Sequence, residues 1–260
     1  MKWIRYQYGG TASYGIVEDN SIEEVSGTPL GQYTRTGHRF PLTAVQIRVP
    51  FVPLTFYAAG INYEEHVREA AALLGREPDL PEKADIGYRA NNALIAHGEP
   101  IVIPSDATEQ VQYEGELVVV IGKTVKRVSE DEALDCILGY TIGNDVSERT
   151  WQAGDRTLWR AKNADTFKPM GPWIETDVDL DSLQTTVRIN GEVMSQFATN
   201  SMIFGVAHYI SEMTRYLTLY PGDMIWMGTD GATQNMKAGD TVDVEIDGIG
   251  TLSNPVVAGE

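Results

Sequence analysis

Strands outnumber helices in the pattern of this sequence, which predicts a mixed α/β fold that is mostly β. Short apolar or alternating segments recur between turn residues along the chain. An Asn-Gly pair at 190–191 separates two such segments, 187–189 and 193–196, and is a strong signal for a two-residue hairpin. Few segments repeat apolar residues at helical spacing; 203–213 is one of them.

The first 50 residues are expected to form a small N-terminal β domain, 1–50. They contain two β-like segments, 3–8 and 14–17, and each is followed by turn residues. Pro50 and Pro53 then mark a boundary, because proline fits poorly inside regular structure. A larger domain is expected to occupy the rest of the chain.

This main domain is expected over 51–260. An apolar segment at 54–59 leads into a helix-like segment at 64–74, which ends at Gly75. The strongest strand signal is 114–122, where two carboxylates are followed by an unbroken apolar run. A run that is apolar on both faces is typical of a strand buried in the core.

A helix and a second strand are expected to follow. Ser129 and Glu132 have the spacing of a capping box, which predicts a helix start. The strand at 138–142 ends in a polar turn at 143–145. The single cysteine, Cys136, excludes an internal disulfide, and its apolar position predicts a packing role in the core.

The end of the chain is predicted to be β again. Residues 240–246 alternate between polar and apolar side chains, and an Asp-Gly pair at 247–248 can form a turn. Residues 250–252 can then return as a partner strand. The sequence contains no internal repeat and no low-complexity tract.

The charge balance excludes several partners. Lys and Arg total 20 against 37 Asp and Glu, which makes the formal net charge −17. This charge opposes binding to nucleic acid or to an anionic membrane surface. The N-terminus lacks the apolar run of a signal peptide, and no stretch approaches the roughly 18 apolar residues of a membrane span. We therefore expect a soluble, cytoplasmic protein.

Glu114 and Glu116 open the predicted buried strand, and the strand period of two places both side chains on the same side. Two ionised carboxylates in an interior require a cation, and their oxygen atoms favour Mg²⁺ first, then Mn²⁺ or Ca²⁺. Alternatively, both glutamates lie on the solvated rim of a strand whose interior begins at Leu117. The E-x-E pattern alone favours this simpler alternative.

Five motifs occur in order along the chain: GINYEEHVRE, YEGELVVVIGK, GNDVSERTWQ, AKNADTFKPMGPWI and PGDMIWMGTDGA. Taken together they resemble the fumarylacetoacetate hydrolase family, and the resemblance extends from about residue 50 to the C-terminus. It implies a rolled, mostly β structure with the active site at one end. It also implies a small preceding domain and assembly as a homodimer.

The resemblance implies specific site residues. The family holds a divalent cation, typically Mg²⁺, on three carboxylates that correspond here to Glu114, Glu116 and Asp145. By pattern alone, Asp145 is a turn residue after a strand. His66 and Glu69 match the family's H-x-x-E pair, which activates water, and their spacing brings them together on one helix face. The alternative for this pair is a solvated helix face.

Other matched positions imply substrate contacts. Lys162 matches a lysine near the metal that holds a substrate carboxylate or stabilises an enolate oxygen; otherwise it is an ordinary surface lysine. Arg149 and Gln152 match positions that line the pocket, and Arg149 either clamps a carboxylate or neutralises the acidic site. Gly228 and Thr229 match a turn whose backbone and hydroxyl meet the same carboxylate.

Two segments depart from the family pattern. Many relatives read G-T-P-x-G where this chain has G-T-D-G-A at 228–232, so that Asp230 replaces a proline. At 88–93 relatives commonly carry an aromatic-x-Lys-Pro-like run, and here Arg89 takes the place of the lysine. Both changes lie beside the expected pocket and bear on the identity of the substrate.

The resemblance thus implies a Mg²⁺-dependent enzyme acting on a small anionic 2-oxo acid. The expected reaction is hydrolysis of a carbon–carbon bond in an acylpyruvate or related 1,3-diketo acid through a metal-stabilised enolate. Decarboxylation of oxaloacetate and isomerisation of an unsaturated 2-oxo diacid use the same enolate and are alternatives. A silent relative that only binds a metal–metabolite complex is a further alternative. Retention of His66, Glu69 and Lys162 argues against it, because binding needs no water-activating base.

Overall fold

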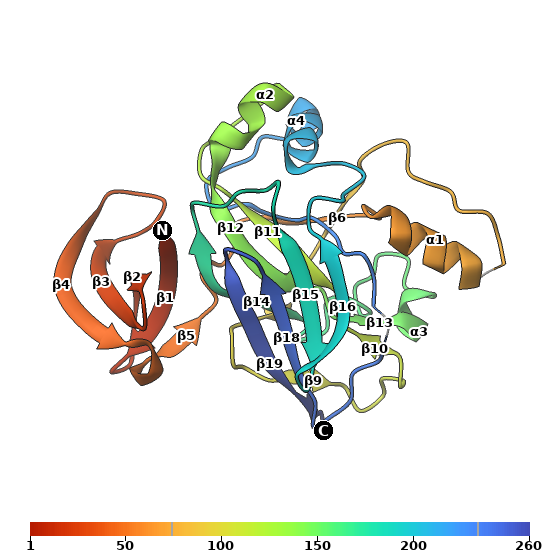
Figure 1. Cartoon of the computed structure of the whole chain (residues 1–260), viewed down its shortest axis with the longest axis horizontal. Helices are drawn as coiled ribbons and strands as arrows, with labels where there is room; N and C mark the ends of the chain where they lie inside the picture. Colours follow the sequence, from red (N-terminus) through yellow and green to blue (C-terminus); the bar gives the residue numbers. More distant parts are fainter. Residues whose placement is uncertain (74, 233) are drawn as a thin grey trace.

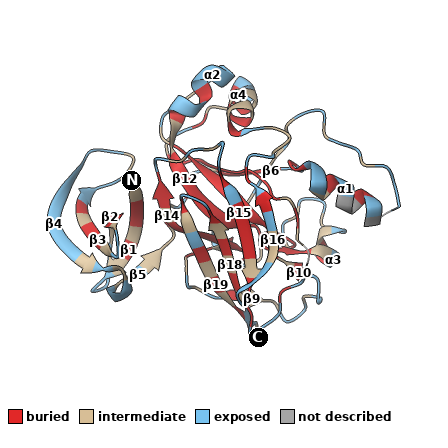
Figure 2. Cartoon of the chain, viewed as in Figure 1, coloured by how far each residue is buried: buried red, intermediate tan, exposed pale blue. Residues whose placement is uncertain are grey.

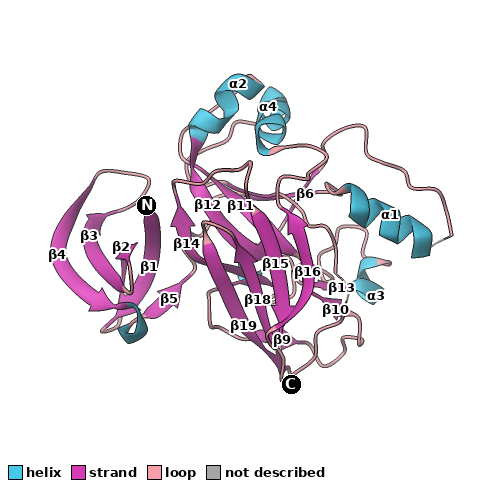
Figure 3. Ribbon diagram, in the orientation of Figure 1, coloured by secondary structure: helices cyan, strands magenta, loops and turns pink. Residues whose placement is uncertain are grey.

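The structure is a computed structural model that describes residues 1–73, 75–232 and 234–260; at 69, 70 and 73 only the backbone is described. Strands form two extended sheets with short helices around them (Figures 1 and 3). The predicted mixed, mostly β fold is confirmed. Within the described residues, no helix has the length and apolar character required to cross a membrane.

The N-terminal unit is an antiparallel meander, seen in red and orange in Figure 1. Strand β1 pairs with β2, β2 with β3 and β3 with β4, while β5 pairs with β1. Ile4, Tyr6 and Ile22 form its small buried core. The strand bounds are β1 Lys2–Tyr8, β2 Thr11–Glu18, β3 Ser21–Gly27, β4 Tyr33–Pro41 and β5 Gln46–Arg48.

Strand β1 also joins this unit to the main sheet, because it pairs with β14 at Lys2 and Trp3. The order then runs from β14 through β12, β11, β17 and β6 to β7. Strand β11 is buried along its whole length, as its apolar run predicts. The bounds are β14 Lys168–Glu175, β12 Ile137–Asn144, β11 Gly115–Ile121, β17 Met224–Trp226, β6 Phe56–Ala59 and β7 Ile86–Tyr88. The domain boundary after residue 50 stays a prediction.

A second sheet packs against the main sheet, and buried residues lie between them (Figure 2). Gly115 permits the close approach, because a Cβ atom there would lie 2.8 Å from Val187 Cγ2 and 2.9 Å from Val244 Cγ1. The sheet order is β16 Glu192–Ala198, β15 Gln184–Ile189, β18 Thr241–Ile246, β19 Gly250–Ala258 and β9 Ile101–Ile103.

Several local predictions are confirmed. Asn190 and Gly191 both have positive φ angles, 53° and 83°, as a two-residue hairpin turn between β15 and β16 requires. The capping box of Ser129 and Glu132 is present, and Cys136 is buried. The bounds of the helices are α1 Glu64–Leu73, α2 Glu130–Ala133, α3 Arg149–Gln152 and α4 Val206–Tyr216. Short elements complete the described chain: β8 Leu94–Ile95, β10 Val111–Gln112, β13 Ser147–Glu148, and the 3₁₀ turns Leu42–Ala44, Asn91–Ala93 and Leu134–Cys136.

Several predicted bounds differ from the structure, and for two of them the contacts give the reason. Helix α4 begins at Val206 rather than at 203, because the N–H groups of Ile203 and Phe204 donate to the backbone and side-chain oxygens of Asn62. The last strand continues to Ala258 rather than ending at 252, because β19 pairs with β18 and then with β9.

Candidate active site

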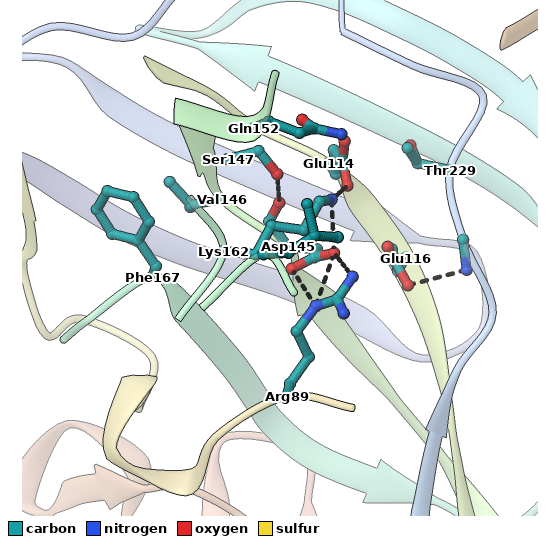
Figure 4. A network of polar contacts seen from close by, with 12 residues as sticks. Arg89, Glu114, Glu116, Asp145, Val146, Ser147, Gln152, Lys162, Phe167 and Thr229 are labelled. Atoms are coloured by element: carbon teal, nitrogen blue, oxygen red, sulfur yellow. Dashed lines mark hydrogen bonds and ion pairs between the residues drawn. The ribbon is translucent and has the colours of Figure 1, made fainter. Parts of the chain in front are cut away.

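Three carboxylates meet at one end of the main sheet (Figure 4). Glu114 and Glu116 flank Gly115 at the start of β11, and Asp145 directly follows β12. Antiparallel pairing places these ends side by side, and the Asp145 N–H donates to the Glu114 carbonyl at 2.8 Å. The ligand atoms of the three lie within 4.8 Å of one another. Their exposed fractions are 4%, 3% and 1%, so the solvated-rim alternative is wrong.

Two cations bind Glu114. The Lys162 ammonium lies 2.5 Å from Glu114 Oε2 and 2.9 Å from Asp145 Oδ2. The Arg149 guanidinium lies 2.6 Å from Glu114 Oε1 and also donates to Gln152 at 2.8 Å. Lys162 is therefore a buried site residue rather than a surface lysine, and Arg149 neutralises the acidic cluster.

Two further cations bind Asp145. Arg89 Nη2 lies 2.8 Å from Oδ2, and its Nε lies 3.2 Å from Oδ1. The fully buried Lys168 ammonium lies 2.6 Å from Oδ1. Sequence reasoning missed Lys168, although a lysine at the start of an otherwise apolar strand is a signal, because a buried ammonium requires a partner.

These charges set the protonation of the carboxyl groups. Burial alone would raise the pKa of Glu114, but the positive charges of Lys162 and Arg149 outweigh it and the pKa lies below its ordinary value. At Asp145, burial is likewise outweighed by its cations, which hold the pKa well below the ordinary range.

Glu116 behaves differently from its two neighbours. Burial, followed by the charges of Asp145 and Glu114, raises the pKa of Glu116 to about 8. The backbone N–H of Gly228 donates to its Oε2 at 2.9 Å. The protein's own cations thus gather around Glu114 and Asp145 and leave Glu116 as the carboxyl that is least compensated.

A cavity of about 150 Å³ opens beside the cluster. His66 on α1, Gln152 on α3, and Gly228 and Thr229 after β17 line it. The complete lining is Ala59, Gly60, Ile61, Asn62, His66, Arg89, Glu114, Glu116, Asp145, Gln152, Leu158, Lys162, Gly228 and Thr229. Arg149 is not among the described residues of this lining, although the family resemblance implied that it lines the pocket. The side chain of Glu69 lies outside the described part of the structure.

A larger cavity of about 270 Å³ lies elsewhere, near the start of α4, and has mainly apolar walls. Its lining includes Leu117, Leu183 and Val206, with Asp181 as its one titratable side chain among the described residues. The smaller cavity is the candidate active site because its wall combines the cluster of three carboxylates with the side chains of His66 and Lys162.

The three carboxylates fit a hard divalent cation. All of their donor atoms are oxygen, the three groups are close enough to share one ion, and each side chain is nearly fully buried. The cluster can therefore hold a metal ion.

Comparison with known proteins decides the family. A family model described as Fumarylacetoacetate (FAA) hydrolase C-terminal matches residues 55–257. The chain belongs to the fumarylacetoacetate hydrolase family. A second model, described as Rv2993c-like, N-terminal, matches residues 1–50. The family predicted from the five motifs is thereby confirmed.

Members of the fumarylacetoacetate hydrolase family with different names resemble the chain to similar extents. Protein Rv2993c of Mycobacterium tuberculosis is 39% identical over 94% of this chain and 90% of its own length. A 2,4-didehydro-3-deoxy-L-rhamnonate hydrolase of a Sphingomonas species is 38% identical over 98% of this chain and 96% of its own. The structure of 5-carboxymethyl-2-hydroxymuconate delta-isomerase from Mycobacterium smegmatis is 35% identical, with a TM-score of 0.89 and full coverage of both chains.

Proposed function

We propose that this protein is a divalent-cation-dependent hydrolase that cleaves a carbon–carbon bond in a small acylpyruvate. One observation carries the proposal: the three carboxylates, His66 and Lys162 all line the same 150 Å³ cavity. Its size suits a short 2-oxo acid.

Glu114, Glu116 and Asp145 would hold the cation, with Mg²⁺ as the first choice and Mn²⁺ or Ca²⁺ as alternatives. When bound, such an ion supplies a Lewis acid that polarises the carbonyl oxygen of a 2-oxo acid. The remaining chemistry belongs to side chains that lie around the same cavity.

His66 is the proposed base. It lies on α1 at the cavity wall, where a neutral imidazole accepts a proton from water as that water attacks the distal carbonyl carbon. Glu69, three residues later on the same helix, would orient the ring and stabilise its charged form.

Lys162 is the proposed electrostatic partner of the substrate. Its ammonium lies at the cavity wall beside Glu114 and Asp145, where it can stabilise negative charge that develops on a substrate oxygen. The Thr229 hydroxyl and the Gln152 amide offer further contacts to a substrate carboxylate. Acetylpyruvate and one water would yield acetate, pyruvate and one proton.

Isomerisation of an unsaturated 2-oxo diacid is the second candidate. The Mycobacterium smegmatis structure named as an isomerase matches the full chain, and isomerisation also needs a group that transfers protons, as His66 can. Decarboxylation of oxaloacetate, the third candidate, needs no such base. The position of His66 therefore favours the first two reactions.

The test is incubation of the purified protein with acetylpyruvate or oxaloacetate, each with Mg²⁺ or EDTA, followed by NMR. We expect Mg²⁺-dependent acetate and pyruvate from acetylpyruvate. His66→Ala should lower this turnover by about 100-fold or more, whereas His38→Ala, at an exposed residue of β4, should leave it unchanged. Turnover of oxaloacetate alone, or equal activity in His66→Ala, would contradict the proposal. Inactivity toward both compounds would also contradict it and would direct the next assay to unsaturated 2-oxo diacids.

A further inference from the structure

Lys168 is a fully buried lysine whose hydrogen bonds are all accounted for. It is the first residue of β14 and has an exposed fraction of 0%. Its ammonium lies 2.6 Å from Asp145 Oδ1 and donates to the carbonyls of Val146 at 3.0 Å and Phe167 at 2.8 Å. An ammonium has three N–H groups, so these three acceptors satisfy it. Burying such a charge is costly unless it is paired in this way.

The ammonium reaches Asp145 from the protein interior rather than from the cavity. Arg89 and Lys162 also contact Asp145, and both line the cavity. Lys168 does not appear among the described lining residues. Oδ1 of Asp145 is therefore bound most closely by a fully buried group behind the site, with Arg89 Nε as a second contact at 3.2 Å, while Oδ2 meets Arg89 and Lys162, which both line the cavity.

We infer that Lys168 is a positioning residue that makes Asp145 a one-oxygen ligand and thereby favours Mg²⁺ or Mn²⁺ over Ca²⁺. The inference rests on the cation site of the proposed function. Ca²⁺ takes six to eight oxygens and often uses both oxygens of one carboxylate, whereas Mg²⁺ requires six ligands in near-octahedral geometry. With Oδ1 of Asp145 bound to Lys168, the bidentate arrangement that suits Ca²⁺ is blocked.

The ratio of the affinities for Mg²⁺ and Ca²⁺ isolates the effect of Lys168 on the geometry of the Asp145 ligand. Removal of the Lys168 charge would strengthen the binding of any divalent cation, because the site would become more negative. Mg²⁺ and Ca²⁺ carry the same charge, so this electrostatic effect cancels in the ratio of their dissociation constants. A change in that ratio reports ligand geometry.

The experiment is an electron paramagnetic resonance titration of Mn²⁺ into the purified protein, with competition by Mg²⁺ and separately by Ca²⁺. We expect the wild-type protein to bind Mg²⁺ more tightly than Ca²⁺. Lys168→Met, which keeps the length but removes the charge and the hydrogen bonds, should shift the ratio toward Ca²⁺ by about tenfold or more. Lys126→Met, at an exposed lysine, is the matched control and should leave the ratio unchanged.

Three results would overturn the inference. The first is an unchanged Mg²⁺ to Ca²⁺ ratio in folded Lys168→Met. The second, which needs no variant, is tighter binding of Ca²⁺ than of Mg²⁺ by the wild-type protein. The third is the absence of Mn²⁺ binding. Turnover of acetylpyruvate is measured separately, so a metal-selective protein without turnover would refute the proposed reaction and leave the role of Lys168 standing.

Discussion

Glu116 should make the metal-free protein less stable as pH rises from 6 to 8. Burial and the charges of Asp145 and Glu114 raise its pKa from 4.5 to about 8. At a pH between these two pKa values, the folded protein keeps a proton on Glu116 that the unfolded chain has released. The unfolded state therefore binds fewer protons, and the free energy of unfolding falls as pH rises.

The expected loss follows from the cited pKa. Each pH unit in this window corresponds to about 1.4 kcal/mol, and the effect levels off as the pH reaches the folded pKa. From pH 6 to pH 8 the loss is about 2 kcal/mol, or roughly 4–8 °C in melting temperature for a chain of this size. Glu116→Gln removes the titrating group while its amide oxygen can still accept the N–H of Gly228.

The assay is urea unfolding of wild type and Glu116→Gln in EDTA at pH 6, 7 and 8. The variant should be the more stable protein, and the difference should widen by about 2 kcal/mol across this range. Glu109→Gln, at an exposed glutamate, is the matched control and should parallel the wild type. A constant difference between wild type and Glu116→Gln would refute the reasoning.

Two further predictions follow from named contacts. Lys162→Met removes the ammonium that contacts Glu114 and Asp145, so we expect turnover of the metal-loaded enzyme to fall by about 100-fold or more. Steady-state kinetics would measure this fall, and a Mn²⁺ binding titration of the variant would serve as the control. Full turnover by the variant would contradict the prediction. Gly143→Ala would place its Cβ 2.5 Å from the buried Trp226 ring, and overpacking of this kind costs about 1–3 kcal/mol. A melting temperature equal to that of the wild type would show that the ring can move aside.

Local patterns predicted those elements that a short stretch of sequence marks by itself. The hairpin at 190–191 needed only its turn residues, and β11 needed only its apolar run. Strand β4, Tyr33–Pro41, went unpredicted because nearly all of its residues are exposed and no apolar period marks it. Its backbone pairing with β3 holds it in place, and sequence pattern does not reveal such pairing.

The sequence likewise predicted some residues of the candidate site and missed others. Glu114, Glu116 and Asp145 were predicted as a set because the family motifs mark them, and the structure brings them together. Lys168 was missed because it lies 23 positions after Asp145 and reaches it only through the pairing of β14 with β12. Arg149 is not among the described lining residues, although its guanidinium pairs with Glu114 beside the cavity, and its contact with a substrate stays a prediction.

The sequence alone determined that two glutamates share one side of a strand, because the period of a strand is a local property of the backbone. It also determined the family, because five short motifs in order are specific. Only the tertiary structure decided that these carboxylates are buried and which cations bind them. Coulomb energies depend on distances in space and on exclusion of water, and the arginines and lysines come from separate segments that only folding brings together.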